Sequence, residues 1–157
     1  MYFEEFAVGQ VLRTRGRTVF DHDIGALIAL AGLYEELFMN REYAERASVF
    51  GRRVAPGLLT LCLAEGLVMS EEWYRNTGLA FLGLDALRLH APVSPGDTLW
   101  VTVHIVETRP SRQPDRGVVV AEHTVENQAG QAVMTFRIAR LVRRRPAAEA
   151  PPGAREA

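Results

Sequence analysis

Residues 31–60 read AGLYEELFMNREYAERASVFGRRVAPGLLT and lead into a strongly apolar segment. Pro56 and Gly57 directly precede that segment, which runs from residue 58 to about residue 74, and mark where its helix is expected to begin. Its leucines and other apolar residues point all round a helix, so we expect this helix to be buried on nearly every side. A second, short helix is expected just before it, over residues 41–46. The stretch therefore places a long buried helix at the centre of the fold.

The residues before this stretch predict a strand and a helix. Residues 10–20, QVLRTRGRTVF, alternate in polarity and are expected to form a strand. Asp21 or Asp23 would then cap a helix, because a carboxylate at a helix start accepts free N–H groups and favours the positive end of the dipole. The apolar face of that helix has the spacing i, i+3, i+4, i+7 and consists of Ile24, Leu27, Ile28 and Ala31.

After Gly78 the pattern changes to strands. Stretches rich in β-branched residues alternate with turn signals, and four strands are expected over residues 79–89, 98–109, 118–127 and 132–143. A buried helix followed by several long strands indicates an α+β domain in which an antiparallel sheet wraps round one central helix.

The composition favours one soluble domain. The chain has 157 residues, a net charge of -1 and a sequence pI near 6.4, so no contact with nucleic acid is expected. The single cysteine fits a reducing compartment, and neither a signal peptide nor a membrane-spanning run is expected. We therefore expect a cytoplasmic protein without a membrane partner. The Pro/Ala/Glu-rich residues 146–157 predict a disordered tail after a domain that spans residues 2–145.

Residues 31–60 also resemble the signature of the MaoC-like hydratases and dehydratases, relatives of the (R)-specific enoyl-CoA hydratases. That signature reads small-Gly-Asp-x-Asn-Pro-Leu-His, then an acidic residue, an aromatic-Ala pair, an aromatic-Gly segment and an Ala-(His or Pro)-Gly that opens a long apolar helix. The matching positions here are Ala31, Gly32, Leu37, Glu42, Tyr43, Ala44, Phe50, Gly51, Val54, Ala55, Pro56 and Gly57. The family's P-V-x-x-G-D-T turn is matched by Pro92, Val93, Gly96, Asp97 and Thr98. The resemblance covers roughly residues 2–143 and implies a single hotdog domain.

Two positions depart from this signature. Leu33 stands where the family has its catalytic Asp, and Phe38 stands where it has its catalytic His. Neither side chain can accept or donate a proton, so the usual acid–base pair is replaced. The resemblance therefore implies an acyl-thioester hydratase or dehydratase, acting between enoyl-CoA and 3-hydroxyacyl-CoA, whose standard mechanism is altered or weakened.

Hydration of an enoyl thioester requires a donor for the negative charge that develops on the thioester oxygen, and groups that move the protons. The resemblance places the oxyanion-hole N–H at Gly57, between Pro56 and Leu58. The first turn of a helix has free N–H groups there, and a glycine lets a ligand approach closely. The alternative is that Pro56 and Gly57 merely start a helix.

The acid–base groups would then come from other residues. Glu35 and Glu36 lie in the same segment, in place of the family's Asn and Pro, and either is a candidate general base. Tyr34 and Asn40 are candidates for orienting water or substrate. The alternatives are a solvated acidic pair on a loop and ordinary turn residues.

Further candidates lie outside this segment. Glu65 is the first charge inside the apolar helix, where some other hotdog enzymes carry an acid, and it is either a base or the partner of an arginine. Cys62 is expected to pack as a small apolar residue. The histidines show no metal-ligand spacing and are His22, His90, His104 and His123. Among them, His90 ends a predicted strand and is best placed to border an acyl pocket.

The implied ligand is an acyl-CoA or acyl-carrier-protein thioester, and no cofactor beyond the coenzyme A of the substrate is expected. Arg52 and Arg53 would pair with coenzyme A phosphates or carrier-protein carboxylates, or else form a solvated basic face. Leu33 and Phe38 would line an acyl tunnel with apolar surface.

Three functions stay open at this point. The first is the hydratase or dehydratase. The second is a non-catalytic hotdog subunit that shapes the acyl tunnel beside an active partner subunit. The third is an acyl-CoA thioesterase in which Glu35, Glu36 or Glu65 activates water. The resemblance also implies at least a homodimer, with pockets at or near the subunit interface.

Overall fold

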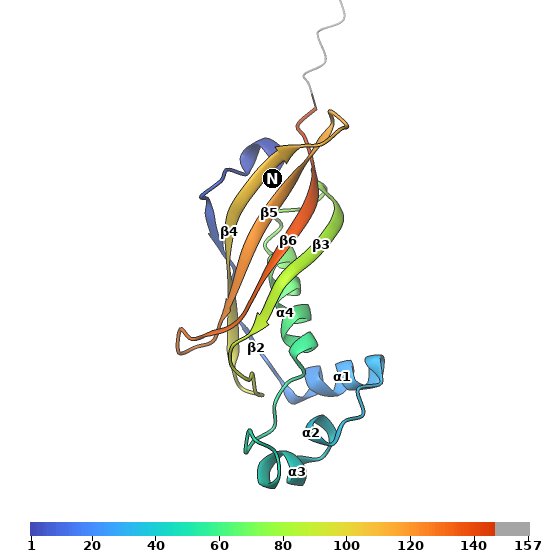
Figure 1. Cartoon of the computed structure of the whole chain (residues 1–157), viewed down its shortest axis with the longest axis vertical. Helices are drawn as coiled ribbons and strands as arrows, with labels where there is room; N and C mark the ends of the chain where they lie inside the picture. Colours follow the sequence, from blue (N-terminus) through green and yellow to red (C-terminus); the bar gives the residue numbers. More distant parts are fainter. Residues whose placement is uncertain (147–157) are drawn as a thin grey trace, which may run out of the picture.

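The computed structural model describes residues 1–146, and Figure 1 shows a curved sheet packed against one long helix. The helices are η1 (Phe3–Glu5), α1 (Asp21–Ala31), α2 (Glu36–Met39), α3 (Arg41–Arg46) and α4 (Gly57–Ser70). The strands are β1 (Val11–Arg13), β2 (Arg17–Thr18), β3 (Gly78–Leu89), β4 (Thr98–Pro110), β5 (Arg116–Glu126) and β6 (Ala132–Arg143). None of the helices in this part of the chain has the length and apolarity needed to cross a membrane.

The sheet is antiparallel, as expected, with the strand order β1-β4-β5-β6-β3, and β2 pairs separately with β4. The four strands expected after Gly78 are confirmed as β3 to β6. The single strand expected over residues 10–20 is divided into β1 and β2. Gly16 lies in the gap, where a Cβ would approach Cε2 of the Trp100 indole to 2.6 Å, so the backbone there bends round this ring.

The core lies between α4 and the face of the sheet turned toward it. α4 buries Leu59, Leu63, Ala64, Leu67 and Val68. Against them pack buried residues of three strands, which include Val101, Val103, Ile105, Val119, Ala121, Phe136 and Ile138. This confirms the α+β fold with a central helix. The domain limit at residue 145 stays a prediction, and the expected tail, apart from Pro146, lies outside the described residues.

One side of α4 is exposed, so the expectation of burial on nearly every side is wrong for the single chain. Apart from Ser70 at its last position, the exposed residues of α4 are Leu58, Cys62, Gly66 and Met69, and we call these four the α4 stripe. Their spacing of i, i+4, i+8, i+11 places them on one face of the helix. Cys62 is therefore exposed rather than packed among leucines. The sheet covers only the opposite face.

Helices α1, α2 and α3 lie beyond the N-terminus of α4 (Figure 1). Asp23 is the capping carboxylate of α1, because its Oδ2 accepts a hydrogen bond from the Phe20 N–H at 2.9 Å. Ile24 and Ile28 bury the predicted apolar face of α1. α3 covers the residues predicted for the short helix, whereas α2, a single turn, is too short for its pattern to be recognised in the sequence.

Candidate active site

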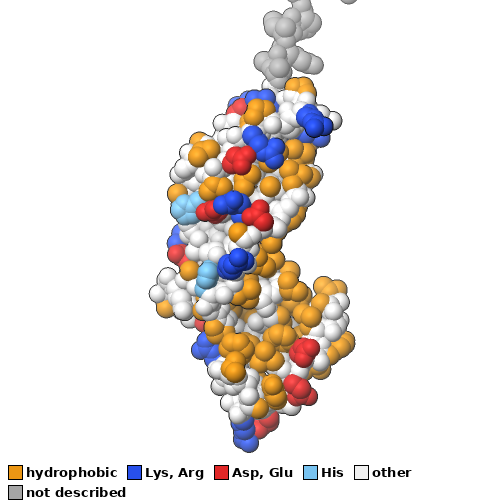
Figure 2. All heavy atoms as spheres, viewed as in Figure 1, with side chains coloured by type: hydrophobic (Ala, Val, Ile, Leu, Met, Phe, Trp, Pro, Cys, Tyr) orange, Lys and Arg blue, Asp and Glu red, His pale blue; other side chains and the backbone are white. Residues whose placement is uncertain are grey.

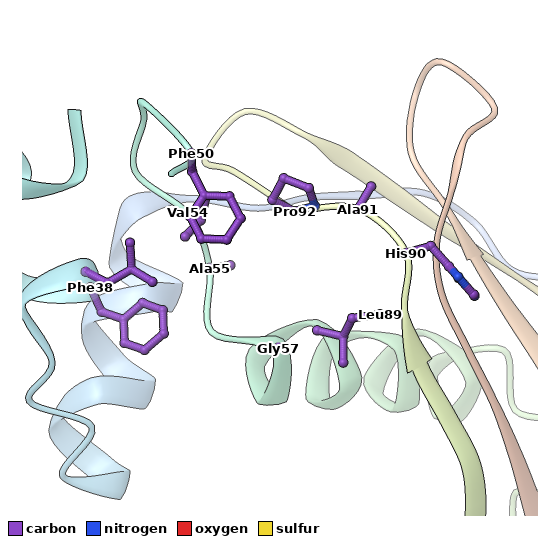
Figure 3. A pocket seen from close by; sticks show the side chains of 10 residues that line it. Phe38, Phe50, Val54, Ala55, Gly57, Leu89, His90, Ala91 and Pro92 are labelled. Atoms are coloured by element: carbon purple, nitrogen blue, oxygen red, sulfur yellow. The ribbon is translucent and has the colours of Figure 1, made fainter. Parts of the chain in front are cut away.

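An apolar cavity of about 360 Å³ opens where α2, the N-terminus of α4 and the end of β3 meet (Figure 3). Its lining residues are Leu37, Phe38, Phe50, Val54, Ala55, Gly57, Leu89, His90, Ala91 and Pro92. Apart from His90, none of them is ionisable. The cavity therefore suits an apolar chain better than a charged ligand.

The first turn of α4 has two free donors at the edge of this cavity. Within residues 1–146, the N–H groups of Gly57 and Leu58 make no hydrogen bond, whereas the Leu59 N–H donates to the Pro56 carbonyl at 2.9 Å. Free N–H groups at a helix start, together with the helix dipole, stabilise a negatively charged oxygen. Gly57 itself lines the cavity, while Pro56 is buried and Leu58 is exposed outside the lining.

The Leu89 side chain lies directly against Gly57. A Cβ on Gly57 would overlap Cδ2 of Leu89, and Figure 3 shows this leucine above the start of α4. Glycine at this position is therefore what permits the close approach of β3 to the free N–H groups.

The two positions that replace the family's acid–base pair differ in their surroundings. Phe38 lines the cavity, and its ring points toward the start of α4 (Figure 3). Leu33 is partly buried against the core and is not among the lining residues. Where the resemblance expects a histidine, the cavity therefore has an aromatic wall.

The acidic and polar candidates of the same segment lie outside the cavity. Glu35 and Glu36 are exposed, and Tyr34 is 68% exposed. Glu36 Oε2 accepts a hydrogen bond from Asn40 Nδ2 at 2.7 Å, and Asn40 Oδ1 accepts one from the Tyr43 N–H at 3.2 Å. The structure thus keeps these side chains at the surface of α2 and α3. Their part in proton transfer stays a prediction.

The basic candidates lie in the sequence between two lining residues of the cavity, Phe50 and Val54. Arg52 is exposed, and Arg53 is half-buried with its Nε 3.2 Å from Asp21 Oδ1. Arg53 directly precedes Val54, a lining residue. His90 also borders the cavity, and its Nε2 lies 2.8 Å from Thr135 Oγ1. Figure 3 shows the His90 ring directed away from Phe38 and Gly57, so its nitrogens do not face the cavity.

Residues 5–127 match the family model described as the MaoC like domain. The chain belongs to this MaoC-like family. Its relatives include the uncharacterized protein YdeM of Bacillus subtilis, with 27% identity over 146 residues that make up 92% of this chain and 100% of YdeM. The β-methylmalyl-CoA dehydratase of Chloroflexus aurantiacus is 28% identical over 152 residues. That match covers 96% of the present chain but only 42% of the dehydratase.

Solved structures agree with the family. The MaoC-like dehydratase from Rhodospirillum rubrum superposes with a TM-score of 0.81 at 28% identity, covering 94% of this chain and 99% of that one. A Mycobacterium tuberculosis protein with a double hotdog fold superposes with a TM-score of 0.83 at 22% identity, covering 98% of this chain and 46% of that one. The MaoC-like resemblance and the hotdog fold expected from the sequence are confirmed.

The MaoC-like domain also has an ion pair between α4 and β6. Arg140 Nη2 donates to Glu65 Oε2 at 2.5 Å, so the arginine partner expected for Glu65 is confirmed. The Arg140 guanidinium carbon lies 5.0 Å from the ring centroid of Tyr74 and 5.6 Å from that of Phe81. Burial raises the pKa of Tyr74, against the opposing effect of the positive Arg140. The sequence gives no sign of Arg140, because its place in a strand looks like that of any solvated arginine.

A second cavity, of about 230 Å³, adjoins this pair and has Arg140, Tyr74, Phe81 and Met69 in its lining. Arg140 is only 8% exposed, and its Nε makes no hydrogen bond within the described part of the chain. The MaoC-like domain therefore has a mostly buried guanidinium, paired with Glu65 through Nη2, in the lining of an otherwise mostly apolar cavity.

The remaining histidines differ in burial. His22 and His104 are exposed, and no cluster of three or more His, Cys, Asp or Glu residues within residues 1–146 could hold a metal ion. His123 is only 1% exposed and stacks on Phe136 with ring centroids 4.7 Å apart. Burial lowers the pKa of His123 to about 3, and the positive charge of Arg140 acts in the same direction. The imidazole is therefore neutral at neutral pH.

This buried histidine predicts a loss of stability in acid. Between pH 3 and 6.5 the unfolded chain binds a proton at His123 that the folded domain does not, so the free energy of unfolding falls as the pH is lowered. From pH 7 to pH 4 we expect wild type to lose about 3 kcal/mol more than a His123→Leu variant. Urea unfolding at both pH values measures the difference. Equal losses in the two proteins would contradict the assignment.

Proposed function

We propose that this protein binds an acyl thioester of coenzyme A or of an acyl carrier protein, and slowly interconverts its enoyl and 3-hydroxyacyl forms. The observation that carries the proposal is the apolar cavity at Gly57, where free N–H groups of α4 adjoin an apolar wall. The thioester oxygen would accept hydrogen bonds from Gly57 and Leu58, with the acyl chain against Phe38 and Leu89. The relative that is a β-methylmalyl-CoA dehydratase supports a CoA thioester as the ligand.

The proposed reaction is slow because the cavity has stabilising donors without the family's proton-transfer pair. Polarisation of the thioester by the two N–H groups lowers the barrier by itself, but water must still lose a proton as it adds to the β-carbon. Glu35 and Glu36 are the proposed sources of the base, since they precede Phe38 by three and two residues at the start of α2. Arg52 and Arg53 are proposed to bind the phosphates of coenzyme A at the rim.

The experiment uses enoyl-CoA thioesters of four, six and ten carbons. Calorimetry should show binding in the micromolar range, and the absorbance of the conjugated thioester should fall slowly as water adds. The Glu35→Gln and Glu36→Gln variants show whether either carboxylate supplies the base. The proposal fails if no chain length binds.

A second candidate is a non-catalytic acyl-binding subunit that pairs with an active hydratase subunit. The apolar lining favours it, because His90 is the one ionisable lining residue and its ring is directed away from the cavity. Thioester binding without turnover, together with co-purification of a second hotdog chain, would support this function. A native protein that is strictly a homo-oligomer would exclude it.

We also propose that the protein forms at least a homodimer in the cytoplasm. Support comes from the exposed α4 stripe, since a helix that is apolar on all sides is normally buried on all sides. Sedimentation at micromolar concentration tests the oligomeric state, and a monomer would contradict it.

A further inference from the structure

β3 is a long edge strand with an apolar surface. It spans twelve residues, pairs with β6 on one side, and within residues 1–146 has no strand on the other side. Three of its large apolar residues are about half exposed, namely Phe81 at 52%, Leu82 at 49% and Leu89 at 59%. Such an edge has unpaired N–H and C=O groups that can bind another strand.

The α4 stripe lies beside this edge at both ends of the strand. Met69, at the C-terminal end of the stripe, shares the second cavity with Phe81. Gly57, next to Leu58 of the stripe, shares the first cavity with Leu89. Figure 2 shows hydrophobic side chains gathered along the side of the molecule where β3 and the helices lie. The free edge and the stripe thus approach each other at both ends of β3, on one apolar side of the molecule.

A second copy of the chain fits this face by symmetry. Two identical edge strands related by a two-fold axis pair in antiparallel fashion, so that the contacts of each copy are repeated in the other. If β3 pairs along most of its length, Leu89 of one copy comes beside the N-terminal part of β3 in the other. The first cavity of each protomer then adjoins the second cavity of its partner.

We propose that this pairing completes the acyl site, and that the partner's Arg140 binds a carboxylate at the far end of the acyl group. The inference rests on the proposed thioester site at Gly57. It assigns the substrate class as thioesters of dicarboxylic acids. The bound acyl group would extend from the free N–H groups of α4 in one chain to the Arg140 guanidinium of the other.

The surroundings of Arg140 suit this role. Nη2 of the guanidinium is used by Glu65, and Nε is shielded from solvent, so the donors for a ligand come from the part of Arg140 that lines the second cavity. A guanidinium has five N–H donors in a planar fork, so it can bind a second carboxylate beside the first. Tyr74 and Phe81 pack on its faces and hold it in place. Glu65 keeps the charge balanced when no ligand is present.

The test compares acyl-CoAs that differ only at their far end. Calorimetry on the wild-type protein uses succinyl-, glutaryl- and adipoyl-CoA against butyryl-, pentanoyl- and hexanoyl-CoA. Charge-assisted hydrogen bonds to a buried guanidinium predict that at least one carboxyacyl-CoA binds about 10- to 100-fold more tightly than its unsubstituted counterpart. Equal affinities within every pair would overturn the inference and leave the proposed function intact. Failure of all six to bind would overturn both.

Variants at Arg140 test the role of this residue. Arg140→Lys keeps a charge for Glu65 but loses the planar fork, so the preference for a carboxyacyl-CoA should largely disappear while binding of hexanoyl-CoA persists. Arg137→Lys is the matched control on the same strand, because Arg137 pairs with Glu122 instead. Should Arg140→Lys unfold, Glu65→Gln/Arg140→Gln replaces the ion pair by neutral groups and is expected to behave in the same way. A folded Arg140 variant that keeps the preference overturns the inference.

Leu82→Lys places like charges at the two-fold edge and should produce a monomer that has lost the carboxylate preference. A monomeric variant that retains the full preference would show that no partner residue is needed, and would overturn the inference. The inference would also be overturned if the wild-type protein were monomeric and still preferred carboxyacyl-CoAs.

Discussion

The double variant Leu33→Asp/Phe38→His is expected to hydrate enoyl-CoA about 10²- to 10⁴-fold faster than wild type. The reason is that the family resemblance places the acid–base pair at these two positions, while the free N–H groups proposed as oxyanion donors are already present at the start of α4. Phe38 lines the cavity, so a histidine at this position would face the substrate. Loss of enoyl-thioester absorbance measures the rate.

Each single substitution is the control for this gain. Leu33→Asp alone and Phe38→His alone should recover only part of the rate. Hydration needs one group to remove a proton from water and another to deliver a proton to the α-carbon, and each single variant has only one of them. If the double variant folds, binds hexanoyl-CoA as well as wild type and shows no gain, the assignment of the two positions is wrong.

Ala91→Trp is expected to weaken the binding of acyl-CoAs by roughly 100-fold or more. Ala91 lines the cavity and packs against the core, so an indole at this position occupies the space of the acyl chain. Excluding four methylenes, at about 0.8 kcal/mol each, removes about 3 kcal/mol of binding free energy. Calorimetry with hexanoyl-CoA measures the change.

Ala129→Trp is the matched control, because Ala129 is exposed in the turn between β5 and β6, outside the lining of either cavity. It should bind acyl-CoA as wild type does. Unchanged affinity in a folded Ala91→Trp protein would show that the acyl chain lies elsewhere.

Much of the fold is predictable from the sequence, because the local pattern of the elements agrees with their burial. β6 alternates between the core and solvent along its length, and its predicted limits agree with the structure. The burial of α4 is not predictable in this way. Its apolar residues lie on every side of the helix. This pattern does not predict that the rest of the chain covers only one side of the helix. The error at Cys62 has the same cause.

The candidate site is predictable in part, for a similar reason. Phe38 and Gly57, which both belong to the spacing shared with the family, line the same cavity, while their roles there stay predictions. It does not predict that Glu35 and Glu36 are exposed, since a single turn such as α2 can direct adjacent side chains either way. The burial of Arg140 cannot be predicted from the sequence, because it depends on the packing of β6 against α4, where Arg140 contacts Glu65.

The contact between Leu89 and Gly57 has a kinetic consequence. In the free protein this leucine stands where an acyl group would approach the N–H groups of α4. In the single chain it is 59% exposed, and exposed side chains change rotamer within picoseconds to nanoseconds, far faster than a ligand arrives by diffusion. In a chain whose β3 edge is free, movement of Leu89 away from the N–H groups therefore adds no delay to association. A β-branched residue at position 89, whose χ1 is restricted, would turn this rapidly opening entrance into a fixed obstacle.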